Sequence, residues 1–169
     1  MLKDLKEGFI DLALIEGVFV PRIFSCHEIT RDKLLVVTSN TSPWREKNKI
    51  SLKEFMEAPL IVREKGSGNR ETMEKHLKRA GLKLDQCNVV AELHSLDAIK
   101  AAVVAGRGIS VLPRLALKAE LHLGTLLGLE IEELPMEQTI HLVYYKCRVQ
   151  GRLAQAFIKF LRSPQRGFC

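Results

Sequence analysis

The sequence predicts an α/β fold in which a mostly parallel sheet is flanked by helices on both faces. The first reason is that short apolar runs alternate along the chain with segments of about ten residues whose apolar positions have helical spacing. Such alternation is typical of strand–helix–strand units, which build parallel sheets. The second reason is that residues 9–15 form an almost uninterrupted apolar run, as expected of a parallel strand covered on both faces.

The N-terminal segment predicts a helix that leads directly into this strand. Residues 1–7 have the spacing of an amphipathic helix, and Gly8 is well placed as its C-terminal cap. A helix that leads into a buried strand normally follows an earlier strand, and the sequence shows none. We therefore expect the sequence to be N-terminally truncated, that is, a piece of a longer protein in which Met1 is not the natural start.

The remaining elements follow from the same patterns. Residues 18–25 are expected to be irregular, and the polar segment 39–43 is a candidate hinge. The helix at 52–56 begins with a capping-box pattern formed by Ser51 and Glu54. Further strands are predicted at residues 28–38, 60–62, 88–93, 108–112, 129–134 and 139–145. Further helices are predicted at residues 70–82, 96–105, 114–122 and 151–162.

The turn at residues 66–69 is the main candidate for a binding feature, because it joins a predicted strand to a predicted helix. Gly66 and Gly68 let the chain reverse tightly at low steric cost. Unpaired N–H groups and the positive end of the helix dipole then face whatever lies above the turn. This predicts one half of an anion-binding cleft. Ser67 or Asn69 can also cap the helix, and one serine can serve both purposes.

In a parallel α/β sheet, ligands bind at the carboxyl ends of the strands. This rule selects three turns, which follow the strands that end near residues 15, 62 and 93. The candidate ligand-binding residues in these turns are Gly17, Val18, Gly66, Ser67, Gly68, Asn69, Arg70, His94 and Ser95. Arg70, or Arg63 before the turn, can add a charge-assisted hydrogen bond to a carboxylate.

The composition argues against several other kinds of protein. Hydrophobic residues make up 46% of the chain but occur in runs well below the roughly 20 apolar residues of a membrane span, and there is no signal-peptide pattern. We therefore expect a cytoplasmic protein without membrane contact. The four cysteines are widely spaced, which predicts neither a disulfide framework nor a metal site, and we expect no cofactor. The net charge of +6 is spread along the chain, which favours a solvated basic surface over a nucleic-acid interface.

Four phrases of the sequence, in their order and spacing, resemble the effector-binding domain of LysR-type transcriptional regulators. They are residues 8–14, 63–71, 95–103 and 105–113. The resemblance implies a two-lobed fold similar to type II periplasmic binding proteins. Residues 1–38 and 146–169 would form lobe I, without its first strand and helix, and residues 39–145 would form lobe II. The DNA-binding winged helix-turn-helix of the family is not found in residues 1–169.

The resemblance also implies a function. A small effector, expected to be a carboxylate or another anion, would bind between the lobes and alter the geometry of the DNA-bound oligomer of a bacterial regulator. We expect self-association to a dimer or tetramer, contact with promoter DNA only through the missing domain, and no enzymatic activity. Two alternatives stay open. One is a solute-binding receptor of a transport system, and the other is a dehydratase-like enzyme that would use Glu16, Glu64 or His94 as an acid or base.

Overall fold

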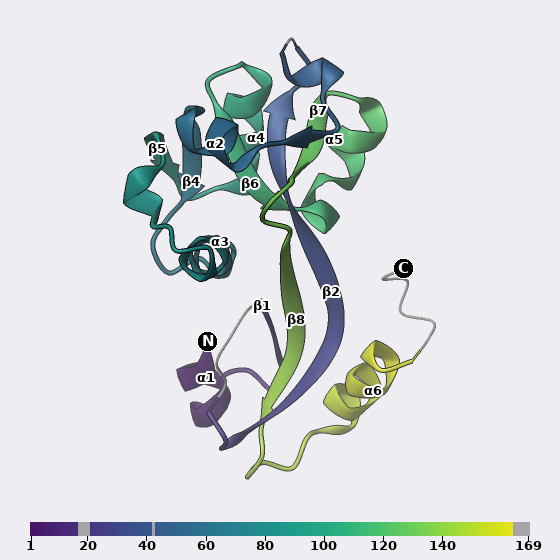
Figure 1. Cartoon of the computed structure of the whole chain (residues 1–169). Coiled ribbons are helices and arrows are strands. Elements are labelled where there is room, and N and C mark those ends of the chain that lie inside the picture. Colours follow the sequence, from purple (N-terminus) through teal and green to yellow (C-terminus); the bar gives the residue numbers. More distant parts are fainter. Residues whose placement is uncertain (17–20, 42, 164–169) are drawn as a thin grey trace. The chain divides into compact units, whose positions relative to one another are not determined.

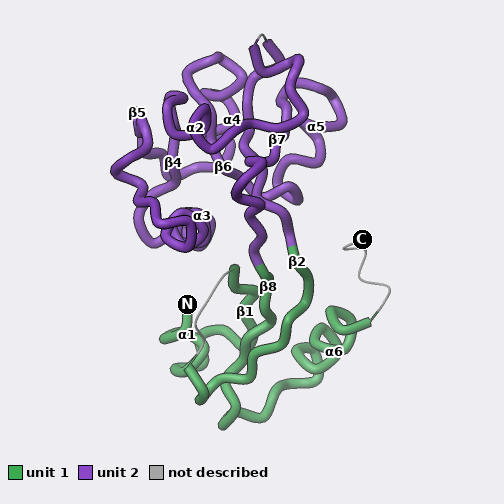
Figure 2. The backbone as a smooth tube through the Cα atoms, viewed as in Figure 1, with its two compact units in different colours: residues 1–31, 139–169 green, residues 32–138 purple. Residues whose placement is uncertain are grey.

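The computed structural model describes residues 1–16, 21–41 and 43–163. The chain divides into two compact units, which are coloured separately in Figure 2. Unit 1 consists of residues 1–31 and 139–169, and unit 2 consists of residues 32–138. Unit 2 is thus continuous in sequence, whereas unit 1 combines both ends of the chain. Strands β2 (Phe24–Ser39) and β8 (Met136–Tyr145) each begin in one unit and end in the other.

Unit 1 is built on a small sheet in which β8 lies between β1 and β2 (Figure 1). Its other elements are α1 (Leu2–Glu7), β1 (Ala13–Glu16) and α6 (Arg152–Leu161). β1 runs antiparallel to β8, from Ala13 opposite Val143 to Glu16 opposite Ile140. Two small apolar clusters hold these elements together. Their buried members are Leu5, Ala13, Phe24 and Val143 in one cluster, and Ile29, Leu142 and Leu161 in the other.

The N-terminal helix is confirmed, but the strand that follows it is shorter than the predicted range 9–15. α1 ends at Gly8, whose φ of 85° lies in the left-handed region. The N–H groups of Phe9 and Ile10 both donate to the carbonyl of Asp4, at 3.0 and 3.5 Å, so they close the helix and do not join a strand ladder. β1 therefore begins only at Ala13.

Unit 2 alternates strands and helices along the chain, as the sequence predicts. Its elements after β2 are η1 (Trp44–Glu46), β3 (Lys49–Ile50), α2 (Leu52–Glu57), β4 (Leu60–Arg63), α3 (Gly68–Arg79), η2 (Leu84–Gln86), β5 (Val89–Leu93), α4 (Leu96–Val104), β6 (Ile109–Pro113), η3 (Arg114–Leu117), α5 (Lys118–Leu123) and β7 (Leu126–Ile131). The capping box of α2 is confirmed: the Ser51 hydroxyl accepts from the N–H of Glu54, and the Glu54 carboxylate accepts from the N–H of Ser51. In the described part of the chain, no helix is long and apolar enough to cross a membrane.

The sheet of unit 2 is mixed. Its strands follow the order β2-β6-β4-β5, and β7 pairs with both β2 and β3. β4 runs parallel to β5 and β6, whereas β2 runs antiparallel to β6 and β7. The α/β class is confirmed, and every parallel pair, including β3 with β7, is separated along the chain by at least one helix, as a crossover connection requires.

Helices cover both faces of this sheet, and the alternation of β2 shows which helix lies on which face. Leu34 and Val36 belong to a buried cluster that includes Phe55 of α2 and residues of α3. Leu35 and Val37 point to the opposite face, where they meet a second cluster from α4 and η3. Unit 2 therefore has two separate cores, one on each side of its sheet.

Several element boundaries differ from those expected. β2 begins at Phe24, inside the segment 18–25 that the sequence predicts to be irregular. β7 and β8 begin at Leu126 and Met136, each three residues before the predicted start. The early start of β7 follows from Gly124, which ends α5 with a φ of 68° and turns the chain directly into the strand. The two-residue strand β3 carries no sequence signal.

Candidate functional site

The turns after β4 and β5 leave the sheet at the same edge. The two strands are parallel and adjacent, with Arg63 opposite Leu93, so Glu64 and His94 emerge side by side. The electrostatics agree with this placement. The Arg63 guanidinium lowers the pKa of Glu64 to about 2, and the imidazole of His94 contributes to the same effect. The sequence therefore predicts correctly that these two turns meet.

The N-terminus of α3 presents free hydrogen-bond donors. Within the described residues, the N–H groups of Gly68, Asn69 and Arg70 find no acceptor. Ser67 occupies the N-cap position, but its hydroxyl accepts no hydrogen bond from the helix. The serine is only 9% exposed. The positive end of the helix dipole and an unused hydroxyl thus lie at one point, which is a suitable arrangement for an anion.

The shape of the turn before α3 depends on Gly66. Its φ of 89° is a conformation that other residues rarely adopt. The turn is closed by a hydrogen bond of 3.2 Å from the N–H of Ser67 to the carbonyl of Glu64. Because no atom lies within 4 Å of the position that a Cβ of Gly66 would take, the glycine is required by backbone conformation and not by crowding.

The neighbouring turn at α4 is built differently. The hydroxyl of Ser95 accepts a hydrogen bond of 3.4 Å from the N–H of Ala98, so this serine caps its helix. Both His94 and Ser95 are exposed. The hydroxyl of Ser95 is therefore hydrogen-bonded to its helix, whereas the hydroxyl of Ser67 has no hydrogen-bond partner in the described part of the chain.

Polar side chains without partners lie buried along α3 and at the start of β8. The amide nitrogen of Asn69 donates to the carbonyl of Val111 at 3.1 Å, but its Oδ1 has no partner in the described part of the chain. The same holds for the hydroxyl of Thr72 and for both amide atoms of Gln138. These three residues are 2%, 6% and 2% exposed, in that order. Buried polar atoms normally have partners, so this set requires water or a ligand.

β8 passes beside α3 next to these groups. His76 Nε2 lies 2.9 Å from the carbonyl oxygen of Glu137, the residue before Gln138. Thr72 is one helical turn before His76 and shares its side of α3. No sequence pattern selects Thr72 or Gln138, because a threonine in a helix and a glutamine in a strand carry no sign of burial.

Both arginines near the turn are already paired with carboxylates. Arg70 donates from Nε to Glu74 at 2.8 Å and from Nη1 to Glu92 at 2.6 Å. Arg63 donates from Nε and Nη2 to the two oxygens of Glu64, each at 2.8 Å. Their positive charges are therefore balanced, and an anion at this turn would depend on the helix N–H groups instead.

Gly17 and Val18 lie outside the described residues. Within the described residues, no group of three or more His, Cys, Asp or Glu side chains is arranged to hold a metal ion.

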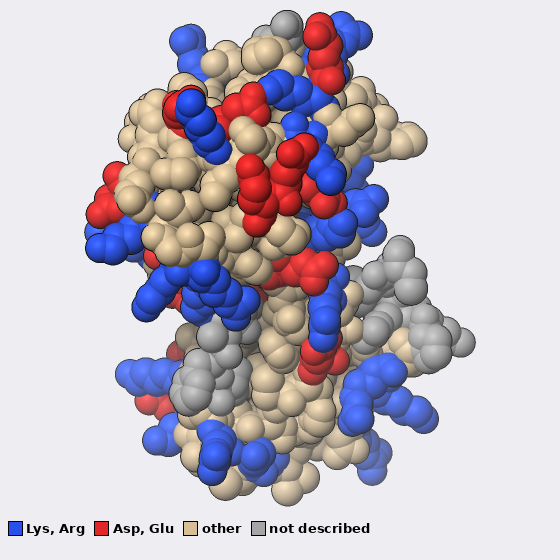
Figure 3. Space-filling model, in the orientation of Figure 1, with Lys and Arg blue, Asp and Glu red and all other residues tan. Residues whose placement is uncertain are grey.

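Charge is divided unevenly between the units: unit 1 holds ten Lys and Arg against five Asp and Glu, and unit 2 holds sixteen against fifteen. On the face drawn in Figure 3, positive and negative side chains are interspersed over unit 2. Attraction of an anion to α3 would therefore come from the N–H groups and dipole of that helix and not from a net charge on unit 2.

Known proteins match nearly the whole chain. The family model for the LysR substrate binding domain matches residues 1–165. The transcriptional activator CmpR of Synechocystis is 37% identical over 128 residues, which cover 76% of this chain and 41% of CmpR. The chain spans about half the length of the curated relatives it matches.

Solved structures agree in fold. The regulatory domain of CcmR from Synechocystis PCC6803, in complex with 2-PG, has a TM-score of 0.85 and 24% identity, covering 99% of this chain and 79% of that chain. The effector binding domain of QuiR, in complex with shikimate, has a TM-score of 0.81 and 21% identity, covering 95% of this chain and 74% of that chain. At these identities the likeness shows the fold alone, and it confirms the fold of type II periplasmic binding proteins. Since the family model covers residues 1–165, the chain belongs to the family of LysR substrate-binding domains.

Proposed function

We propose that this chain is the effector-sensing domain of a LysR-type transcription regulator and that a small anion binds at the N-terminus of α3. The observation that carries the proposal is the group of unpartnered polar atoms at this place. Within the described residues, it comprises the N–H groups of Gly68, Asn69 and Arg70, the hydroxyls of Ser67 and Thr72, the Oδ1 atom of Asn69 and both side-chain amide atoms of Gln138.

The chemistry of these groups indicates the kind of ligand. Successive N–H groups at a helix start hold carboxylate or phosphate oxygens, helped by the dipole. The amide of Gln138 and the hydroxyl of Thr72 can each donate and accept, so they suit hydroxyl groups on the same ligand. The proposed effector is therefore a small hydroxylated acid. The complexes of CcmR with 2-PG and of QuiR with shikimate support a small-molecule ligand.

The second turn has a lesser part in the proposed site. His94 lies close enough to affect the pKa of Glu64, so we propose that its imidazole and Ser95 line the entrance. Gly66 is retained as a backbone contact of the ligand. A ligand changes a regulator only if it binds two conformations with different affinities. Gln138 is the last residue of unit 2 and lies on a strand that continues into unit 1, so its amide is a suitable contact for such a difference.

The proposal can be tested by titrating the chain with small carboxylates, beginning with 2-PG and shikimate, and following backbone amides by NMR. The amides of Gly68, Asn69 and Arg70 should shift most. Ser67→Ala and Thr72→Val should each weaken binding about tenfold or more, since a hydrogen bond to a charged ligand contributes roughly 1.5–3 kcal/mol. Ser51→Ala is the matched control, because it removes a serine from another helix cap of unit 2 and should leave affinity unchanged.

Two results would contradict the site. One is that no carboxylate in the series moves the amides at the start of α3. The other is that Ser67→Ala and Thr72→Val bind the ligand as tightly as the unchanged chain. Consumption of the ligand would favour the dehydratase-like alternative over a sensor.

The proposed regulator self-associates to a dimer or tetramer in the cytoplasm and reaches promoter DNA through another domain. The relatives are transcriptional regulators, which supports this context. Sedimentation velocity with and without the carboxylate measures self-association directly. A chain that stays monomeric at all concentrations would favour the solute-receptor alternative.

A further inference from the structure

A surface hollow of about 360 Å³ lies on unit 2 away from α3. Its lining residues are Lys33, Leu35, Asn48, Lys49, Arg114, Leu121, Gly128 and Glu130. Leu35 belongs to the apolar cluster of α4 and η3, whereas Met73 and Leu77 of α3 belong to the cluster on the opposite face of the sheet. The hollow and the proposed effector site are therefore separated by the sheet itself.

The floor of the hollow is apolar and depends on a glycine. A Cβ on Gly128 would lie 2.8 Å from Leu35 Cδ1 and 3.3 Å from Leu121 Cδ2. The missing side chain lets these two leucines approach the β7 backbone closely. The hollow above the side chains of Leu35 and Leu121 is therefore open, and part of its lining is apolar.

Three positive side chains surround one carboxylate at the rim. Lys49 lies opposite Glu130 in the parallel pairing of β3 with β7, and Lys33 Nζ lies 2.6 Å from Glu130 Oε1. Arg114 begins η3, directly after β6. The side chain of Lys33 lowers the pKa of Glu130, and the charges of Lys49 and Arg114 add to this, which places both near the carboxylate. Arg114 also lies near the buried carboxyl of Asp32: burial raises the pKa of Asp32, and the charge of Arg114 acts against this rise.

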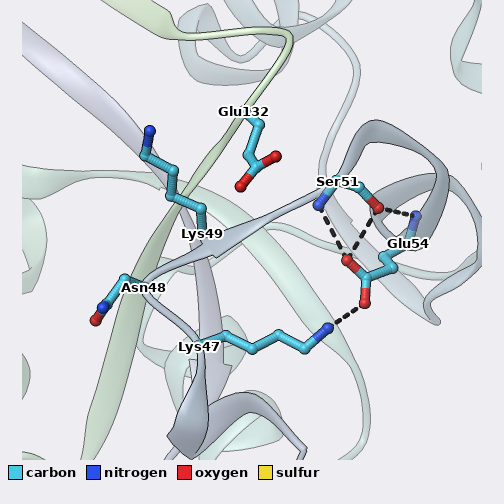
Figure 4. Close-up of a pocket in the computed structure, with 6 residues that line it drawn as sticks. All are labelled: Lys47, Asn48, Lys49, Ser51, Glu54 and Glu132. Atoms are coloured by element: carbon cyan, nitrogen blue, oxygen red, sulfur yellow. Dashed lines mark hydrogen bonds and ion pairs between the residues drawn. The ribbon is translucent and has the colours of Figure 1, made fainter.

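Two of these cations have no carboxylate of their own. Within the described residues, neither Lys49 Nζ nor the Arg114 guanidinium lies within 4.0 Å of a carboxylate oxygen. The adjoining hollow shown in Figure 4 is different, because there the Glu54 carboxylate bonds to Lys47 and to Ser51. In that view Lys49 points away from the Lys47–Glu54 pair. Lys49 lines both hollows, and on the side of the adjoining hollow the lining also contains the carboxylates of Glu54 and Glu132.

We propose that the hollow between β2, β7 and η3 is a second binding site, which takes a small dianion between Lys49 and Arg114. A planar guanidinium can hold two oxygens of one anionic group, and an ammonium can approach the same group from another side. Lys33 remains on Glu130, which leaves the side chains of Lys49 and Arg114 for the ligand. The leucine floor accommodates a short apolar part attached to the anionic group.

Sulfate is the test probe, because it stays a dianion throughout the neutral pH range. Backbone amides of the full chain are followed by NMR during addition of sodium sulfate, with sodium chloride keeping the ionic strength constant. The amides of Lys49, Arg114 and Gly128 should shift in a saturable way. Lys49→Gln and Arg114→Gln should each weaken sulfate binding about tenfold, and the double variant should abolish saturation.

Two further variants make the result specific. Glu130→Gln removes the one carboxylate that lines the hollow in the described part of the chain and should tighten sulfate binding several-fold, an effect that loss of structure would not produce. Lys53→Gln is the matched control, because Lys53 is 81% exposed and does not line the hollow. The proposal is wrong if the double variant and the unchanged chain give the same saturation curve, or if Glu130→Gln weakens binding.

Discussion

Replacing Ser95 by alanine should destabilise the chain, whereas the same replacement at Ser67 should not. Both serines are N-caps of helices in unit 2, but only the hydroxyl of Ser95, and not that of Ser67, accepts a hydrogen bond from its helix. Loss of a capping serine costs roughly 0.5–2 kcal/mol. The bond from the N–H of Ala98 is 3.4 Å long, so we expect about 0.5–1 kcal/mol for Ser95→Ala. For Ser67→Ala we expect less than about 0.5 kcal/mol, as for a substitution that removes no interaction.

Urea unfolding followed by circular dichroism can separate these values, because slopes of roughly 1–3 kcal/mol per molar turn them into measurable midpoint shifts. Hydrogen exchange adds a local readout: Ser95→Ala should speed exchange at the start of α4, and Ser67→Ala should leave α3 unchanged. Equal losses in the two variants would show that the Ser67 hydroxyl caps α3. In that case the hydroxyl would not be free for a ligand, and the proposed effector site would lose a central donor.

Three further predictions concern stability. Lys47 lowers the pKa of Glu54 from 4.5 to about 2, so the folded chain should lose stability as the pH falls from about 4.5 towards 2. Acid unfolding curves should show a smaller loss of stability over this pH range for Glu54→Gln. Gly108→Ala should cost at least about 1–3 kcal/mol in urea unfolding, because the new Cβ would lie 2.5 Å from the carbonyl oxygen of Pro59 at a φ of 155°; a near-neutral result would refute this. Phe55→Ala should cost about 3–5 kcal/mol, because the ring is fully buried, and a loss below 1 kcal/mol would contradict the packing.

The sequence predicts the elements of unit 2 well because local patterns and tertiary packing agree there. The capping box at Ser51 and the apolar run at residues 60–62 each specify one structure. In unit 1 the apolar run at residues 9–15 misleads, since hydrogen bonds from Phe9 and Ile10 to Asp4 end the helix at the expense of the strand. Composition does not record such competition between neighbouring backbone groups.

The candidate site was only partly predictable from sequence. The turns that follow adjacent parallel strands lie at the same edge of a sheet. This general rule places Glu64 and His94, which follow β4 and β5, side by side. The unpaired hydroxyl of Thr72 and the amide of Gln138 depend on what α3 packs against, which involves residues more than sixty positions apart. The neutralisation of Arg70 by Glu92 is likewise a long-range contact.

The division into a continuous and a discontinuous unit affects the order of folding. Unit 2 is complete once residue 138 has been synthesised, and β4 pairs with β5 and β6 over fewer than fifty residues. β1 must wait for β8, because Ala13 pairs with Val143. Loop closure over such a separation is slow, so on the ribosome unit 2 is expected to fold first. The N-terminal segment would remain without its partner strand until β8 has been synthesised.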